Sequence, residues 1–243
     1  MRRRYPRPPI VEAVIELGFL TDFEPDELAK ALHSKLSQRY AGEPFKRARV
    51  EFGATIGPEE VSASTRRVPH LSFLRSADGL RLLGCRARAL SVHVLSPYPG
   101  WENFREQLEE ALGALPDEIR DSGLARMGVR YIDHIVLPRE ATSFVDYVKV
   151  FPSCPDALPR VVSSFQFVTQ TVDPDDATIA RMVLARGPEE GPSIVFDLHL
   201  QRQGEPLAAV DDGSWRSILE ALHERQREVF EGAITDKARE LFS

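Results

Sequence analysis

Two glutamates, Glu12 and Glu16, stand in the stretch "PPIVEAVIEL" near the start of the chain. The residues around them alternate between two sides with period two, which predicts a β-strand over residues 10–20. Both carboxylates then lie on the same side of the strand, about 13 Å apart at the usual rise per residue. The carboxylates of a glycosidase act at a separation of about 5 to 9.5 Å. We therefore expect a partly wet sheet face here, not a catalytic dyad.

Two later stretches also place ionisable residues at alternate positions. Arg126, Arg130 and His134 share one side of "ARMGVRYIDHIVLP", and Asp197 and His199 share one side of "SIVFDLHLQ". If these strands are neighbours, opposite charges can pair across them. Such a face suits architecture or docking better than catalysis, because structural ion pairs often resemble sites.

A ligand pocket within the sheet is the alternative interpretation of this charged face. Its candidate ligand-binding residues are Glu12, Glu16, Arg130, His134 and His199. Arg86 and Arg88, in "GCRARALS", are expected to share a side of one strand and to belong to the same face. Asp133 falls on the opposite, apolar side of its strand, where a buried carboxylate needs a partner.

No motif identifies a catalytic residue, a metal site or a cofactor. The six histidines show neither HxH nor HExxH spacing, so a metal site built from His93, His134, His199 and a carboxylate is a minor alternative. The glycine patterns of phosphate-binding loops and of nucleophile elbows are missing from the sequence. The aromatic pair of "YPGW", Tyr98 and Trp101, is expected to pack a helix onto the sheet and not to stack a ligand. We expect no cofactor and no bound metal, and we lean against an enzyme.

The elements that must position these residues predict an α+β fold. Strand-like segments follow one another with hairpin signals at "SADG" and "DPDD", which indicates a mostly antiparallel sheet with helices packed on one face. We expect a single domain over residues 1–243. Two subdomains, 1–138 and 160–243, joined by the proline-rich segment 139–159, are the alternative, since each half has a strand meander followed by a helix with an early tryptophan. A threonine at position 235 is expected to cap a short last helix.

Composition limits the class of protein. The chain has 243 residues, of which 42% are hydrophobic, and a formal net charge of −6. The acidic balance disfavours nucleic-acid binding, although local basic patches exist in "MRRR" and at Lys46, Arg47, Arg49, Arg66 and Arg67. Its two cysteines, Cys85 and Cys154, form no CxxC motif, so we expect a reduced, cytoplasmic setting. No apolar run is long enough for a membrane span, and no signal peptide is expected.

Four blocks of sequence together resemble the TIGR04255 family. They are "PPIVEAVIEL", "PYPGWENFREQLEEAL", "RMGVRYIDHIVLP" and "ITDKARELF", in this order along essentially the whole chain. The resemblance implies a sporadically distributed, uncharacterised prokaryotic protein of about this length, often with Asn where this chain has Asp133. It implies an accessory role, such as phage defence or a toxin–antitoxin-like pairing. No catalytic residue can be assigned to this chain from the resemblance.

Three functions follow as expectations. The first is a binding or assembly protein that acts through a partner protein or as a homo-oligomer, by an exposed strand edge or polar face. The second is an enzyme or small-ligand-binding protein with a charged pocket within the sheet. The third is nucleic-acid binding through the local basic patches. We expect the first, and no membrane partner.

Overall fold

The computed structural model describes residues 4–56, 61–141, 143–151, 164–188 and 190–243, and between residues 47 and 70 it describes the backbone alone. These residues form one antiparallel sheet of nine strands, with five α-helices. The strand order is β2-β3-β4-β5-β1-β6-β9-β8-β7. The α+β fold class expected from the order of the elements is therefore confirmed.

The strands are β1 Ile10–Phe19, β2 Phe45–Ile56, β3 Val61–Arg75, β4 Arg81–Arg86, β5 Ala89–Leu95, β6 Leu124–Val136, β7 Gln166–Val172, β8 Ile179–Arg186 and β9 Ser193–Ala208. The helices are α1 Pro25–Leu36, α2 Trp101–Gly113, α3 Asp117–Asp121, α4 Trp215–Ala233 and α5 Asp236–Glu240, with a short 3₁₀ helix, η1, at Phe144–Asp146. Both expected hairpins are present: "SADG" joins β3 to β4, and "DPDD" lies between β7 and β8.

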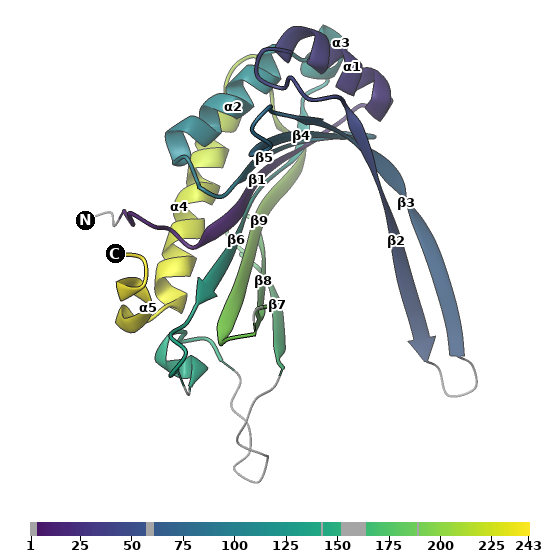
Figure 1. Ribbon diagram of the computed structural model, residues 1–243. Coiled ribbons are helices and arrows are strands. Elements are labelled where there is room, and N and C mark those ends of the chain that lie inside the picture. The colour runs from purple at the N-terminus through teal and green to yellow at the C-terminus, as the bar shows by residue number, and fades with distance from the viewer. Residues whose placement is uncertain (1–3, 57–60, 142, 152–163, 189) are drawn as a thin grey trace.

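The helices pack on one face of the sheet, and none of the described helices covers the other face (Figure 1). α1 contacts β3 and β4, α2 contacts β5, and α4 contacts β6 and β9. The sheet bends so that the long β2–β3 hairpin and the β7–β9 strands descend like the two legs of an arch, with the helices outside it (Figure 1). We call the uncovered side of the sheet, which lines the inside of the arch, the open face.

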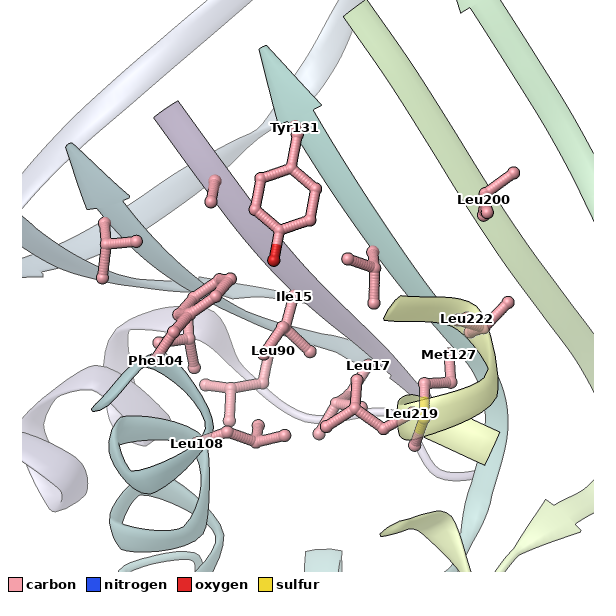
Figure 2. Close-up of a cluster of buried hydrophobic side chains, with 14 of the residues drawn as sticks. Ile15, Leu17, Leu90, Phe104, Leu108, Met127, Tyr131, Leu200, Leu219 and Leu222 are labelled. Atoms are coloured by element: carbon pink, nitrogen blue, oxygen red, sulfur yellow. The ribbon is translucent and has the colours of Figure 1, made fainter. Parts of the chain in front are cut away.

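Alternation along each strand decides which residues enter the core. In β1 the odd-numbered residues Ala13 to Phe19 are at most 1% exposed, whereas the even-numbered Glu12 and Glu16 lie on the open face. The helices contribute stripes at helical spacing. Figure 2 shows the resulting cluster, in which side chains of the four central strands β5, β1, β6 and β9 meet α2 and α4; its labelled members are Ile15, Leu17, Leu90, Phe104, Leu108, Met127, Tyr131, Leu200, Leu219 and Leu222. Burying each aliphatic side chain of this kind stabilises the fold by about 1.5 to 3 kcal/mol.

The segment "GCRARALS", expected to belong to one strand, contains the turn of a hairpin. β4 ends at Arg86 and β5 begins at Ala89, with a tight turn at Ala87 and Arg88. Arg88 has a φ of 93°, a left-handed conformation that is uncommon for residues other than glycine. The expectation that Arg86 and Arg88 share a side of one strand is therefore wrong: Arg86 ends β4, and Arg88 occupies the turn.

The two ends of the described chain lie beside each other near α5 (Figure 1). The Arg7 backbone N–H donates to the Phe242 carbonyl at 3.2 Å, and the Tyr5 ring meets the Phe242 ring edge-on at 5.3 Å. Thr235 caps α5 as expected, because its side chain accepts a hydrogen bond from the Ala238 N–H. None of the helices in the described residues is both long and apolar enough to cross a membrane.

Candidate functional site

The open face collects the ionisable side chains that alternate with the core residues of β1, β5, β6 and β9. β1 lies between β5 and β6, and β6 lies between β1 and β9. Arg130 is opposite Val14 of β1 on one side and opposite His199 of β9 on the other. All five residues proposed from the sequence as ligand-binding, Glu12, Glu16, Arg130, His134 and His199, thus occur on three adjacent strands.

Glu12 takes part in a chain of hydrogen bonds that the sequence analysis did not anticipate. Its Oε1 lies 2.8 Å from Nδ1 of His93 on the neighbouring strand β5. The other ring nitrogen, Nε2, lies 2.8 Å from Oγ of Ser91. A signal was present in the sequence, since Ser91 and His93 are two residues apart and so share a side of one strand.

The order serine, histidine, carboxylate is that of an activated nucleophile, but the surroundings of Ser91 do not suit acyl transfer. Ser91 is only 7% exposed, and its Oγ lies over Gly84, close to where the Phe73 ring packs. Its backbone is paired with Glu16 of β1 and with Gly84 of β4, so the neighbouring N–H groups belong to sheet ladders and not to an oxyanion hole. The two hydrogen bonds, to Glu12 and to Ser91, hold the His93 imidazole in one orientation.

Glu16 is shared between two arginines. Its Oε1 lies 3.2 Å from Nη2 of Arg126 and 3.6 Å from Nη1 of Arg86. The glutamate side chain is 19% exposed, whereas Arg86 is 50% exposed. Two guanidinium groups therefore converge on one oxygen atom of a largely buried side chain.

Arg130 is held by Asp197 in a bidentate pair, with its Nε 2.7 Å from Oδ1 and its Nη2 2.6 Å from Oδ2. Hydrogen bonding to Asp197 raises the pKa of the Arg130 guanidinium above its usual value. Burial lowers the pKa of His199, although the Glu16 charge acts in the opposite direction. His199 is therefore neutral at pH 7 and can accept a hydrogen bond.

His134 lies apart from this group, at the other end of β6. Its register partner is Val195, and its Nε2 is buried without a hydrogen-bond partner among the described residues. Ser193 Oγ is buried and unpartnered in the same way, and a Cβ built on Gly187 would come within 3.0 Å of both side chains. The candidate set is thus brought onto one face, but His134 does not join the ion pairs of Glu16 and Arg130.

The other sequence-based candidates do not add to a site. No group of three or more metal-binding side chains occurs in the part of the chain that the structure describes. Lys46 forms an ion pair with Asp26, and Arg4 lies 3.5 Å from Glu102. The rest of the basic patches, residues 1–3 and the side chains of Arg47, Arg49, Arg66 and Arg67, lies outside the described residues.

The aromatic pair of "YPGW" packs on the helix side of the sheet, as expected. The Trp101 ring stacks on His223 at 3.7 Å, and Tyr98 Oη lies 3.0 Å from Tyr131 Oη. Burial lowers the pKa of His223 to about 4. Trp101 Nε1 also donates to Glu220 at 3.0 Å, so the pair fastens the start of α2 to α4.

On the open face, Glu16 therefore pairs with Arg126 and Arg86, Asp197 pairs with Arg130, and Glu12 is hydrogen-bonded to His93. These pairs fix the orientation of the charged side chains on the open face. A charged side chain of this face can leave its internal partner to bind an external group. A scan against profiles of protein families and a search of curated protein sequences both found no match to this chain.

Proposed function

We propose that this chain is a binding and assembly protein that associates with a second copy of itself through the outer edge of β7. The accessory prokaryotic setting and the cytoplasmic location implied by the sequence belong to the same proposal. The observation that carries it is an exposed strand edge without charge. β7, "QFVTQTV", contains neither a charged residue nor a proline, and it is the last strand of the sheet on its side.

Natural proteins usually protect such edges with charges, prolines or bulges. β7 shows none of these devices over its seven residues, which pair with β8 in unbroken register. Val168 is 47% exposed and Val172 is 60% exposed. A strand of this composition is suited to pairing with another strand.

The hydrogen-bond pattern identifies which backbone groups point outward. The Asp173 N–H donates to Thr178 and the Arg186 N–H donates to Phe165, so odd-numbered residues of β7 bond to β8. The N–H and C=O groups of Gln166, Val168, Gln170 and Val172 then face the outer edge. Within the described residues, no strand pairs with them.

A two-fold axis at Thr169 makes this edge self-complementary. Antiparallel pairing about that residue places Val168 opposite Gln170 of the second copy and Gln166 opposite Val172, so that outward groups meet outward groups. About eight main-chain hydrogen bonds can form in this way. Because β7 has no charge, the two copies meet without the like-charge repulsion that would oppose pairing.

An enzyme built on the open face has less support. Three of the candidate residues are already engaged by side chains of neighbouring strands: Glu12 by His93, Glu16 by Arg126 and Arg130 by Asp197. The hydroxyl of Ser91 is buried. Nucleic-acid binding likewise has only Lys46 and Arg4 among the described basic residues of its patches, and both have acidic partners.

The test is the oligomeric state, measured by size-exclusion chromatography with light scattering at about 10 to 100 μM protein. We expect a dimer, and we expect Val168→Lys and Gln170→Pro to shift it to monomer. Proline removes an outward N–H at position 170 and leaves the bonds to β8 in place. Val145→Lys is the matched control, since Val145 is 54% exposed but lies in η1, away from β7. A wild-type monomer throughout this range, or a dimer that survives both β7 changes, refutes the proposal.

A further inference from the structure

A pocket of about 330 Å³ opens at one end of the open face, where the β4–β5 turn lies beside the end of β1 and the start of β6. Three arginines line it: Arg86 from β4, Arg88 from the turn and Arg126 from β6. Its other lining residues are small, apart from Phe19. None of the five residues proposed from the sequence lines this pocket.

The sheet ladder is interrupted at this place. The pairing of β1 with β6 shifts between Gly18 and Phe19, and the pairing of β6 with β9 shifts between Leu124 and Arg126. Ala125 is thus left out of both ladders and lines the pocket. Bulges of this kind redirect side chains and are enriched next to binding sites.

The pocket needs small residues because the backbones approach closely. A Cβ on Gly18 would lie 3.1 Å from Cβ of Arg126. Alanines at positions 87, 89 and 125 leave the three guanidinium groups as the only long polar side chains of the lining. The walls are apolar and the rim is cationic, which is typical of a site for a small organic anion.

The charges around the pocket do not balance. Three guanidinium groups face two carboxylates, because Glu16 serves both Arg126 and Arg86 and Asp22 lies 3.5 Å from Arg88. Among the described residues the Arg86 guanidinium donates no hydrogen bond, since its Nη1 is 3.6 Å from Glu16. Its side chain is also 50% exposed, so an incoming oxyanion can reach unused donors.

Glu16 marks the position of that oxyanion. Its Oε1 is the single atom on which the Arg86 and Arg126 guanidinium groups converge, at 3.6 and 3.2 Å. A carboxylate oxygen and a phosphate oxygen present the same acceptor to a guanidinium fork. The protein's own carboxylate thus competes for the donors that an external anion requires.

Arg88 supplies a third donor from a strained turn. A left-handed residue in a two-residue hairpin is usually Gly, Asn or Asp, yet Arg88 adopts a φ of 93° here. Its Nη2 donates to the Leu20 carbonyl at 3.1 Å, which fixes the guanidinium at the mouth of the pocket.

We propose that this pocket binds the phosphate group of a small metabolite, with Arg86 and Arg126 as the principal ligands, Arg88 at the rim and Glu16 as the internal competitor. The site is separate from the β7 edge, so it stands or falls independently of self-association. Its volume is near the lower end for ligand pockets and has room for an organic part beside the phosphate.

The test is titration of the full-length protein with inorganic phosphate and with phenyl phosphate at low ionic strength, followed by calorimetry and by amide NMR shifts. We expect saturable binding by both probes below about 10 mM. Arg126→Gln and Arg86→Gln should each weaken it at least about tenfold, because each removes a guanidinium that binds the phosphate directly. Glu16→Gln should strengthen it about tenfold, because removing one buried negative charge nearby favours the anion. If Glu16 served only to stabilise the fold, its substitution would not raise the affinity for phosphate.

Arg216→Gln is the matched control, since Arg216 is 55% exposed and pairs with Glu109 on the helix side. If Arg126→Gln fails to fold, the loss of phosphate affinity in Arg86→Gln and the gain in Glu16→Gln still test the proposal, because Arg86 is exposed. No saturable binding of either probe, an unchanged affinity in Glu16→Gln, or an equal loss in Arg216→Gln overturns the proposal.

Discussion

Asp133 should make the protein less stable as the pH rises through neutrality. The residue lies on the core side of β6, 3% exposed, opposite Ile10 of β1 and Phe196 of β9. Burial, and secondarily the Asp197 charge, raise the pKa of its carboxyl from 3.8 to about 8. No hydrogen bond to this carboxyl is found within the described residues. We therefore expect Asp133 to be protonated in the folded chain and ionised in the unfolded chain at pH 7.

The magnitude follows from this difference. Folding at pH 7 requires uptake of a proton by a group whose pKa in the unfolded chain lies about three units below that pH, which costs about 4 kcal/mol. Because the folded pKa is the higher one, this cost is absent below about pH 4, grows as the pH rises, and reaches its full size above about pH 8. Asp133→Asn has the shape of the protonated acid and needs no proton. It should raise the free energy of unfolding by up to about 4 kcal/mol at pH 7.

Urea unfolding at pH 7 and pH 8.5 measures the effect. Over this range the wild type should lose about 1 kcal/mol of stability that Asp133→Asn retains. Burial lowers the pKa values of His199 and His223 in the folded chain, and an imidazole in an unfolded chain titrates at about 6.5, so neither group adds much to the change between pH 7 and pH 8.5. Asp175→Asn, in the exposed β7–β8 turn, is the control. If Asp133→Asn is no more stable than the wild type at pH 8.5, the reasoning about a protonated buried acid is wrong.

Three further predictions concern the cap, a close contact and the buried hydroxyl. Thr235→Ala should lower the free energy of unfolding by about 1 kcal/mol in urea, since it removes the acceptor for the Ala238 N–H, and Thr235→Ser should restore most of it. Gly84→Ala should cost about 1 to 3 kcal/mol in the same assay, because its Cβ would lie 2.5 Å from Ser91 Oγ and 2.8 Å from the Phe73 ring; an unchanged stability would contradict this packing. Ser91 should not react with a fluorophosphonate probe in the folded protein, as followed by intact mass, and stoichiometric labelling would revive the enzyme hypothesis.

Sequence periodicity predicted the sheet and its two faces because side-chain direction along a strand is a local property. Glu12 and Glu16 were expected on a face opposite the apolar residues of β1, and they lie there. The hairpin signals at "SADG" and "DPDD" and the cap at Thr235 are local too, and all three are confirmed. Local chemistry was therefore sufficient for element type and for the orientation of most side chains.

The β4–β5 hairpin was missed because its turn has neither glycine nor asparagine. The available signal was a change of parity: buried residues occupy odd positions at Leu83 and Cys85 and even positions at Leu90 and Val92. A single strand cannot move its apolar residues from odd to even positions without a bulge or a turn. Recognising that change would have placed Arg88 at a strand end and revealed the rim of the pocket.

The partners of the charged residues could not be predicted, because strand order is not a local property. Glu12 pairs with His93 across 81 positions of sequence, and Arg130 pairs with Asp197 across 67. His134 shares a face with both groups, but its distance along β6 separates it from them. The alternation of polar and apolar residues along a strand identifies which side chains share a face of the sheet. Which of those side chains contact one another depends on the order of the neighbouring strands.

The central position of β1 has a consequence for how the protein is made. β1 leaves the ribosome before both of its neighbours, β5, which ends at Leu95, and β6, which ends at Val136. The residues from β1 through Val136 must therefore be synthesised before both sides of β1 can pair fully. During that interval an apolar strand has two open edges, a state prone to aggregation. Glu12 and Glu16 keep one of its sides charged while the nascent chain waits.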